Sequence, residues 1–339
     1  MKETPVTILN ENCETLSFDP DQPRPIGITA FDASAIMGTN PYKGRLETWA
    51  EKVGKVPLEV GRPSRARREL KRAVAQMYAE KHNAVVFYWP RTLRSLNFDF
   101  MEYRMEYVIC DAPDLRKGVV HDADGVSGEP PNIVAVLDVR AVGITGPAST
   151  YEWADDEVPA KYETQGRHAF AVTGIGRVVY AALVANEGLV VRTRNYDADD
   201  IQELVETEFG FWENVETETA PEVDGSESTF RALHTMYPTS VEGKSVVLEG
   251  DAVDTYRQWA NAKDMADTSG KLADLLRAKL ELVVGDAESV VVDGKVVITY
   301  KKSKDSERFD TNAFCEAHPE LAKEFTMTVP GSRRWTQKK

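Results

Sequence analysis

The ten residues from 133 to 142 restrict most strongly how this chain can fold. They read IVAVLDVRAV and are apolar except for Asp138 and Arg140. A short and nearly continuous apolar run rich in valine is typical of a strand inside a sheet that is covered on both faces. Residues two apart on a strand point to the same side. The sequence therefore predicts a buried strand with an acid and a base side by side.

Helical and strand-like segments surround this strand. The clearest helix spans 63–83, where Leu70, Val74, Met77 and Tyr78 fall on one face. A short helix over 28–38 has Thr29 as its expected N-cap and ends at Gly38. Further helices are predicted at 45–53, 157–174 and 199–215, and further strands at 84–89, 103–110, 178–185 and 189–193. This order predicts an α/β or α+β core.

The C-terminal third has a different character. Residues 216–245 resemble a linker, since they contain several prolines, glycines and serines. Beyond it, 251–284 predicts one long helix or two helices joined near Ser269-Gly270, and 290–299 predicts a hairpin turning at Asp293-Gly294. We therefore expect an irregular segment over 1–24, a core over 25–245 and a helical and hairpin appendage over 246–339.

The charge balance counts mildly against nucleic acid as a partner. The net charge is −14, with 55 acidic against 41 basic residues, and an acidic chain repels nucleic acid at long range. One helix is an exception, because it carries a basic run of Arg62, Arg65, Arg67, Arg68, Lys71 and Arg72. This run fits a solvated helix or a contact with the DNA backbone equally well.

The cysteines and the N-terminus indicate the compartment. Cys13, Cys110 and Cys315 lie far apart and form no C-x-x-C pair, which argues against a disulfide framework and a four-cysteine metal site. The first 16 residues lack the apolar core of a signal peptide, and no run reaches the roughly 18 apolar residues of a membrane helix. We expect a cytoplasmic protein without a membrane segment, in the host cytoplasm if a phage encodes it.

Four segments together carry a family resemblance. They are GITAFDASAIMGTNPYKGRLETWAEKVGK at 27–55, EVPAKYETQGRHAFAVTG at 157–174, FWENVETETAPEVDGSESTFRALHTMYP at 211–238, and a tail with ERFDTNAF, HPEL and SRRW. In this order they resemble the YqaJ-type viral recombinase family, and the tail resembles that of phage members.

The resemblance implies a fold and an activity. The family is similar to lambda exonuclease and shares the PD-(D/E)xK nuclease core, a central mixed sheet flanked by helices. The implied function is a phage recombination protein, a Mg²⁺-dependent 5′-to-3′ exonuclease that acts on double-stranded DNA ends and prepares them for a single-strand annealing partner. A homo-oligomer is expected by analogy with the lambda enzyme.

The nuclease chemistry needs carboxylates that hold a hard cation. By resemblance, Asp138 and Arg140 stand at the two ends of the (D/E)xK motif, and Gln165 stands in the glutamine motif. The motif aspartate is assigned to Asp124, which with Asp138 would bind the metal. Asp111 and Asp114 stay open as alternatives for that position.

Several positions depart from the family pattern. Lys71 stands where the family has a helical glutamate. If the chain is an inactive relative, the Lys71 ammonium is expected to stand where the metal ion normally lies and to pair with Asp124 and Asp138. Phe31 stands where lambda exonuclease uses a serine to contact the terminal phosphate.

The DNA-binding residues are assigned on the same resemblance and on the basic run. They are Arg24, Thr29, Arg68 and Arg72. The departures from the family pattern are compatible with two hypotheses. The first is a weakened exonuclease, and the second is an inactive nuclease-fold protein that binds DNA ends or a recombination partner. A third hypothesis is an acidic protein that acts through protein–protein contacts of its helical appendage.

Overall fold

The computed structural model describes residues 11–16, 27–58, 65–120, 128–142, 153, 156–184, 187–329 and 331–337. It divides into two compact units, Met1–Pro238 and Thr239–Lys339. The domain boundary expected at 245 thus lies inside the second unit. Each unit is described by itself below.

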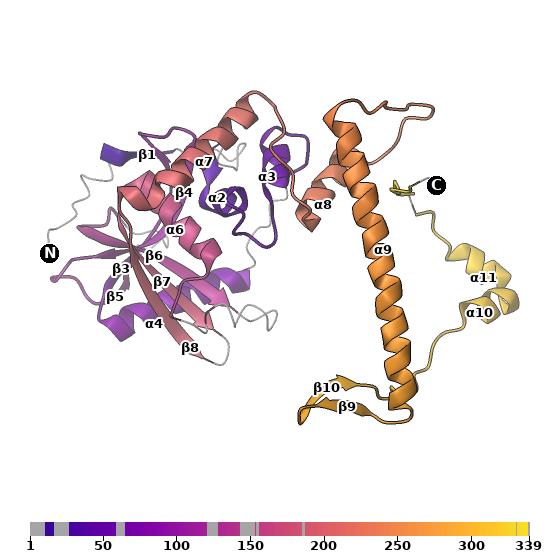
Figure 1. Ribbon diagram of the computed structural model, residues 1–339. Helices are drawn as coiled ribbons and strands as arrows, with labels where there is room; N and C mark the ends of the chain where they lie inside the picture. The colour runs from indigo at the N-terminus through magenta and orange to yellow at the C-terminus, as the bar shows by residue number, and fades with distance from the viewer. Residues whose placement is uncertain are drawn as a thin grey trace. The chain divides into compact units, whose positions relative to one another are not determined.

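A mixed sheet forms the centre of the first unit (Figure 1). Its main path runs β1-β3-β4-β6-β7-β8, and β2 and β5 pair with β4 and β3. Along this path the β6–β7 pair is parallel, and every other pair of neighbouring strands is antiparallel. The strands are β1 Cys13–Thr15, β2 Ile28–Thr29, β3 Val85–Ser95, β4 Met101–Cys110, β5 Gly118–Val120, β6 Ile133–Val142, β7 Arg177–Val184 and β8 Gly188–Asn195.

Helices cover both faces of this sheet. They are α2 Ala30–Ile36, α3 Arg45–Lys52, α4 Arg65–His82, α6 Ala160–Thr173, α7 Ala198–Glu216 and α8 Glu227–Met236. One apolar cluster joins Val74 and Ala79 of α4 to Leu137 and Val139 of β6. A second cluster, on the other face, contains Val136 of β6 together with residues of α2, α3, α6 and α7. The predicted α/β class with a central mixed sheet flanked by helices is confirmed.

The alternation of side chains along β6 determines the side of the sheet to which Asp138 and Arg140 point. Leu137 and Val139 pack on the α4 side, and side chains alternate along a strand. Asp138 and Arg140 therefore point to the α6 side of the sheet. The strand itself spans the predicted residues 133–142.

The N-terminal helix begins as its sequence predicts. The Thr29 side chain caps α2 by accepting from the backbone nitrogen of Asp32, and the Asp32 carboxylate accepts from the backbone nitrogen of Thr29. This reciprocal capping box satisfies two helix-end donors at once. Gly38 follows the helix with a φ of 72°, a left-handed conformation that glycine adopts without strain.

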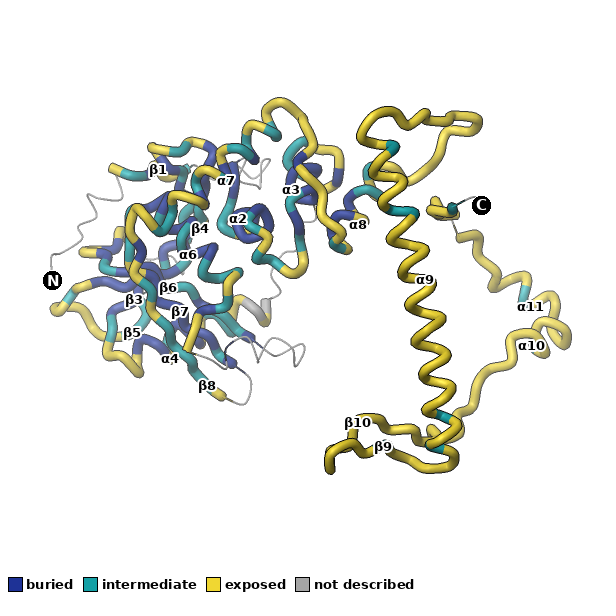
Figure 2. The backbone as a smooth tube through the Cα atoms, in the orientation of Figure 1, coloured by how far each residue is buried: buried dark blue, intermediate teal, exposed yellow. Residues whose placement is uncertain are grey.

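The second unit is built around α9, which spans Asp251–Val284. It is one continuous helix, because it passes through Ser269-Gly270 without a break. None of its 34 residues is buried, and Figure 2 shows the exposure along its length. The predicted hairpin forms as β9 Ser289–Val292 and β10 Lys295–Thr299, with positive φ at Asp293 and Gly294.

Two short helices, α10 Thr311–Ala317 and α11 Pro319–Glu324, follow the hairpin. None of the helices in the described part of the chain combines the length and the apolar character needed to cross a membrane.

Candidate functional site

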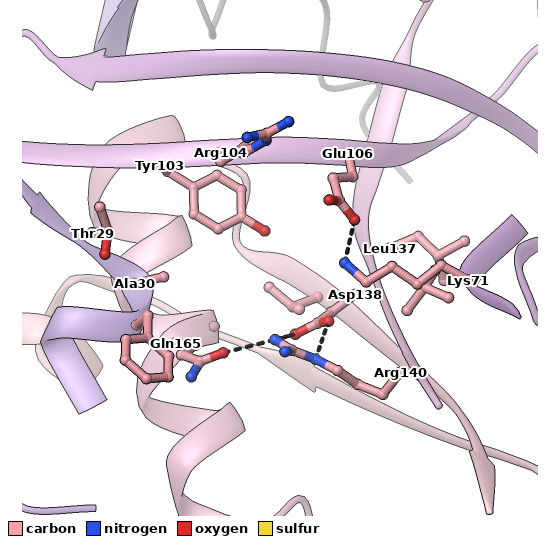
Figure 3. A pocket seen from close by; sticks show the side chains of 14 residues that line it. Thr29, Ala30, Lys71, Tyr103, Arg104, Glu106, Leu137, Asp138, Arg140 and Gln165 are labelled. Atoms are coloured by element: carbon pink, nitrogen blue, oxygen red, sulfur yellow. Dashed lines mark hydrogen bonds and ion pairs between the residues drawn. The ribbon is translucent and has the colours of Figure 1, made fainter. Parts of the chain in front are cut away.

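A pocket of about 300 Å³ opens where α2, α4, α6 and four strands of the sheet, β2, β4, β6 and β7, meet. Figure 3 shows it from close by. It brings together residues that are far apart in the sequence. Its polar and aromatic lining consists of Thr29, Phe31, Lys71, Tyr103, Arg104, Glu106, Asp138, Arg140 and Gln165.

The β6 pair is bound to α6 inside this pocket. The Arg140 Nη2 donates to Asp138 Oδ2 and to Gln165 Oε1, both at 2.7 Å, and the Arg140 Nε lies 2.6 Å from Asp138 Oδ1. The Gln165 amide donates in turn to the Ser34 hydroxyl at 3.4 Å. The guanidinium therefore links the acid of the sheet to the glutamine of the helix, as Figure 3 shows.

Arg140 stays charged in this setting. Burial alone would lower the pKa of Arg140, but the adjacent Asp138 carboxylate raises it above its usual range. Burial, with Asp138 as the next cause, raises the pKa of Tyr103, so that phenol stays neutral. Neither the Arg140 guanidinium nor the Tyr103 phenol can therefore act at neutral pH as a base that takes a proton from a water molecule.

The second acid of the pocket is paired as well. Lys71 of α4 lies 2.5 Å from the Oε2 atom of Glu106 on β4. The partner predicted for Lys71 was the pair Asp124 and Asp138. Among the described residues the ammonium pairs with Glu106 instead, because Arg140 already binds the Asp138 carboxylate.

The charge of the pocket favours an anion over a cation. Lys71, Arg104 and Arg140 face two acids, Glu106 and Asp138, which leaves one positive charge in excess. A hard divalent cation needs several carboxylate or carbonyl oxygens that are free to bind it. Both carboxylates are bound to cationic side chains, and the described residues contain no group of three or more potential metal ligands. These donors do not fit Mg²⁺.

Residues 21–176 match the YqaJ-like viral recombinase domain. The segment includes every residue that lines the pocket except Val178. This part of the chain is similar to that family, and the match covers somewhat less than half of the 339 residues. The family expected from the four sequence segments is therefore confirmed over the part that builds the pocket.

A relative from Bacillus subtilis strain 168 carries the name "Uncharacterized protein YqaJ". It is 24% identical over 300 residues, which cover 87% of this chain and 86% of the relative. Among solved structures, the alkaline exonuclease LHK-Exo of Laribacter hongkongensis matches with a TM-score of 0.43 and 13% identity, covering 57% of this chain and 90% of that chain. LHK-Exo in complex with dAMP matches with a TM-score of 0.42 and 11% identity at the same coverage.

The other predicted site residues do not all lie at the pocket. Thr29 lines the pocket, but its hydroxyl donates to Asp32 at 2.9 Å within the helix cap. Arg68 is exposed, and Arg72 lines a separate shallow pocket with Glu69 and Gln76. Of the three members of the basic run whose side chains the structure describes, Arg68, Lys71 and Arg72, Lys71 alone lines the main pocket.

Two predicted residues, Asp124 and Arg24, lie outside the described residues. The alternatives Asp111 and Asp114 are exposed beyond the end of β4 and do not line the pocket. The annealing partner and the homo-oligomer remain predictions.

Sequence reasoning missed Glu106, Arg104 and Tyr103. All three lie on β4, next to β6 in the sheet. All three lie within the predicted strand 103–110. The available signal was Glu106, an acid in an alternating strand that precedes the motif strand in the sequence.

A buried His168–Glu208 pair holds α6 behind the pocket. His168 Nδ1 lies 3.0 Å from Glu208 of α7, and His168 Nε2 lies 3.0 Å from the backbone oxygen of Glu102. Burial would lower the pKa of His168, but Glu208 raises it. Both ring nitrogens of His168 therefore have partners within the fold.

Close packing fixes the same helix against the sheet. A Cβ atom at Gly166 would collide with the Tyr180 hydroxyl of β7, so only glycine fits there. That hydroxyl is fixed by a 2.9 Å hydrogen bond to the hydroxyl of Tyr196. Gln165, the neighbour of Gly166, is therefore held in place by backbone packing.

Proposed function

We propose that this chain is a DNA recombination protein whose pocket binds a backbone phosphate at a DNA end without hydrolysing it. The YqaJ-like domain supports a nuclease-like or recombination role. The observation that carries the finer proposal is the pairing of both pocket acids with cations of the chain itself.

The pocket offers the donors that a phosphate needs. Arg104 is exposed at the pocket and makes no ion pair with a described residue. Arginine presents a planar fork of N–H donors that matches phosphate oxygens. Arg140, which stays charged, adds a second guanidinium.

The acidic total charge sets the conditions for binding. A net charge of −14 opposes the approach of DNA at long range, so binding depends on local contacts with phosphates. Phosphate contacts release counterions and weaken as salt rises. We therefore expect detectable affinity at low ionic strength and a steep decline with added salt.

The test measures binding and cutting on the same DNA. Fluorescence anisotropy with a blunt duplex in EDTA should show salt-sensitive binding, weakened in Arg104→Gln but not in the control Arg116→Gln, an exposed arginine outside the pocket. The same duplex with Mg²⁺ or Mn²⁺ should stay intact. Absence of binding at low salt would overturn the proposal.

The second candidate is the metal-dependent exonuclease. It is favoured by the two carboxylates, Glu106 and Asp138, that two neighbouring strands supply to one pocket. It predicts digestion of the duplex with Mg²⁺ that disappears in Asp138→Asn. That result would replace the non-hydrolytic proposal.

A further inference from the structure

A row of alternating aromatic rings and cations leads away from the pocket. The Arg140 guanidinium lies over the Tyr162 ring, with its carbon 4.4 Å from the ring centre. Lys161 Nζ lies 5.0 Å from the centre of the same ring and 5.5 Å from that of Tyr42. The row therefore runs Arg140, Tyr162, Lys161, Tyr42, from inside the pocket to the surface.

The outer end of the row is exposed but firmly held. Tyr42 is 67% exposed. Its backbone nitrogen donates to Asn40 Oδ1 at 2.9 Å, and its backbone oxygen accepts from Arg231 at 3.0 Å. A large ring on an anchored loop loses little conformational freedom when a ligand stacks on it.

A second exposed ring stands at the pocket itself. Phe31 lines the pocket and is 50% exposed, with Lys43 Nζ 5.7 Å from its ring centre. A cation over the face of an aromatic ring is attracted to it. The pocket mouth therefore repeats the combination found in the row, an open aromatic face next to a positive charge.

We propose that this row, together with Phe31, binds single-stranded DNA and leads it to the pocket. The inference rests on the proposed function and names its substrate as an unpaired strand. Aromatic rings stack on unpaired bases of any sequence, while interleaved cations contact the phosphates. The bases of an intact duplex are stacked on one another and cannot lie on these rings.

The row also assigns separate tasks to its members. Tyr42 and Phe31, the most exposed rings, stack on bases. Lys161, between two rings, contacts the phosphate that joins the stacked nucleotides. Arg140 ends the row inside the pocket, where the terminal phosphate is bound.

The experiment compares four labelled DNAs by anisotropy at low salt in EDTA. They are a thymidine oligonucleotide of about 12 nucleotides, an abasic oligonucleotide of the same length, a blunt duplex, and the same duplex with an unpaired overhang. Tyr42→Ala and Phe31→Ala should each weaken thymidine binding by roughly fivefold or more. Their affinities for the abasic strand and the blunt duplex should change little, and the overhang should lose its advantage.

Matched variants separate stacking from folding. Tyr42→Phe keeps the ring and should bind like the natural chain. Phe209→Ala removes a ring of similar exposure, 52%, that packs on Phe100 outside the row, and should bind normally. Lys161→Met should weaken the thymidine and abasic strands alike, because it removes a phosphate contact. Melting curves followed by circular dichroism confirm that each variant is folded.

The outcomes distinguish the two proposals. Unchanged thymidine binding in both ring variants, with intact binding of the blunt duplex, would overturn the row and leave the proposed function standing. Equal losses on the abasic and thymidine strands would also overturn it. Failure of the natural chain to bind any of the DNAs would overturn the proposed function itself.

Discussion

Lys71 of α4 and Glu106 of β4 form an ion pair of 2.5 Å at the edge of the pocket that holds Asp138. The lysine stands where the family resemblance places a glutamate, so a cation of the chain occupies a position expected to carry a metal ligand. The glutamate that binds it sits on a strand that neighbours the motif strand β6. The pair therefore neutralises one of the two carboxylates that the described pocket offers.

Restoring the family residues should restore metal binding. The double variant Lys71→Glu with Arg140→Lys puts three carboxylates in the pocket, because position 71 becomes an acid beside Glu106 and Asp138. Glu106 loses its ammonium partner, and Asp138 loses the two-pronged guanidinium contact. We expect this variant to bind Mn²⁺ in calorimetry and the natural chain not to. Lys71→Met, which frees Glu106 without adding an acid, is the control and should bind far less. Equal Mn²⁺ binding by the natural chain would contradict this account.

Removing the strand acid should strengthen DNA binding. Asp138→Asn keeps an acceptor for Arg140 but removes the negative charge, so the pocket gains one net positive charge. We expect a few-fold tighter binding of a blunt duplex in EDTA at low salt, with the gain vanishing as salt rises. Unchanged or weaker binding would count against phosphate capture.

The buried Asp32 should make the free energy of unfolding depend on pH. Burial alone would raise the pKa of Asp32, but Lys52 at 3.0 Å and Lys43 at 3.5 Å hold it below its ordinary value. Stabilisation of this kind is present above the unfolded pKa of about 3.9 and is lost as pH falls through the folded pKa. Asp32→Asn should lower the free energy of unfolding by about 3 kcal/mol at neutral pH.

Urea unfolding at several pH values checks this dependence. The gap between the natural chain and Asp32→Asn should narrow as the solution becomes more acidic than about pH 4. Glu14→Gln, an exposed acid on β1, is the control and should show no gap at any pH. A gap that is independent of pH would assign the loss to the helix cap alone.

Gly166 tolerates no side chain while the Tyr180 hydroxyl is present. Gly166→Ala should destabilise the chain by about 2 kcal/mol, because the new methyl group collides with that hydroxyl. In a Tyr180→Phe background the same substitution should cost clearly less. Thermal unfolding of the four chains in this double-mutant cycle measures the coupling, and additive losses would show that the contact is unimportant.

The local sequence pattern was sufficient to predict the strand β6 and the beginning of the helix α2. An apolar run and a capping sequence are properties of neighbouring residues, so both could be predicted from the sequence. The partner of Lys71 could not, because Glu106 is 35 residues away and meets the lysine only when α4 packs on the sheet. The predicted pairing with Asp138 was wrong for the described residues, since Arg140, two residues along the same strand, is the nearer cation.

The helix α8 shows the same limit. Residues 227–236 lie in the stretch 216–245, which was predicted to be a linker from the prolines, glycines and serines in it. The helix is fixed by residues far away in the chain: Arg231 binds Glu47 of α3 at 2.7 Å, and Ser228 accepts from the Gly44 backbone at 2.8 Å. Burial alone would raise the pKa of Glu47, but the hydrogen bonds of Arg231 and Ser228 lower it. Contacts over such separations leave no periodic signal.

The long helix α9 has a consequence for the rate at which its amide hydrogens are replaced. With none of its 34 residues buried, it is held by its backbone hydrogen bonds and by exposed pairs such as Arg277 and Glu281. Such pairs add only a few tenths of a kcal/mol, and a helix without packing opens from its ends. In heavy water, α9 should therefore take up deuterium long before the buried strands β6 and β7 do.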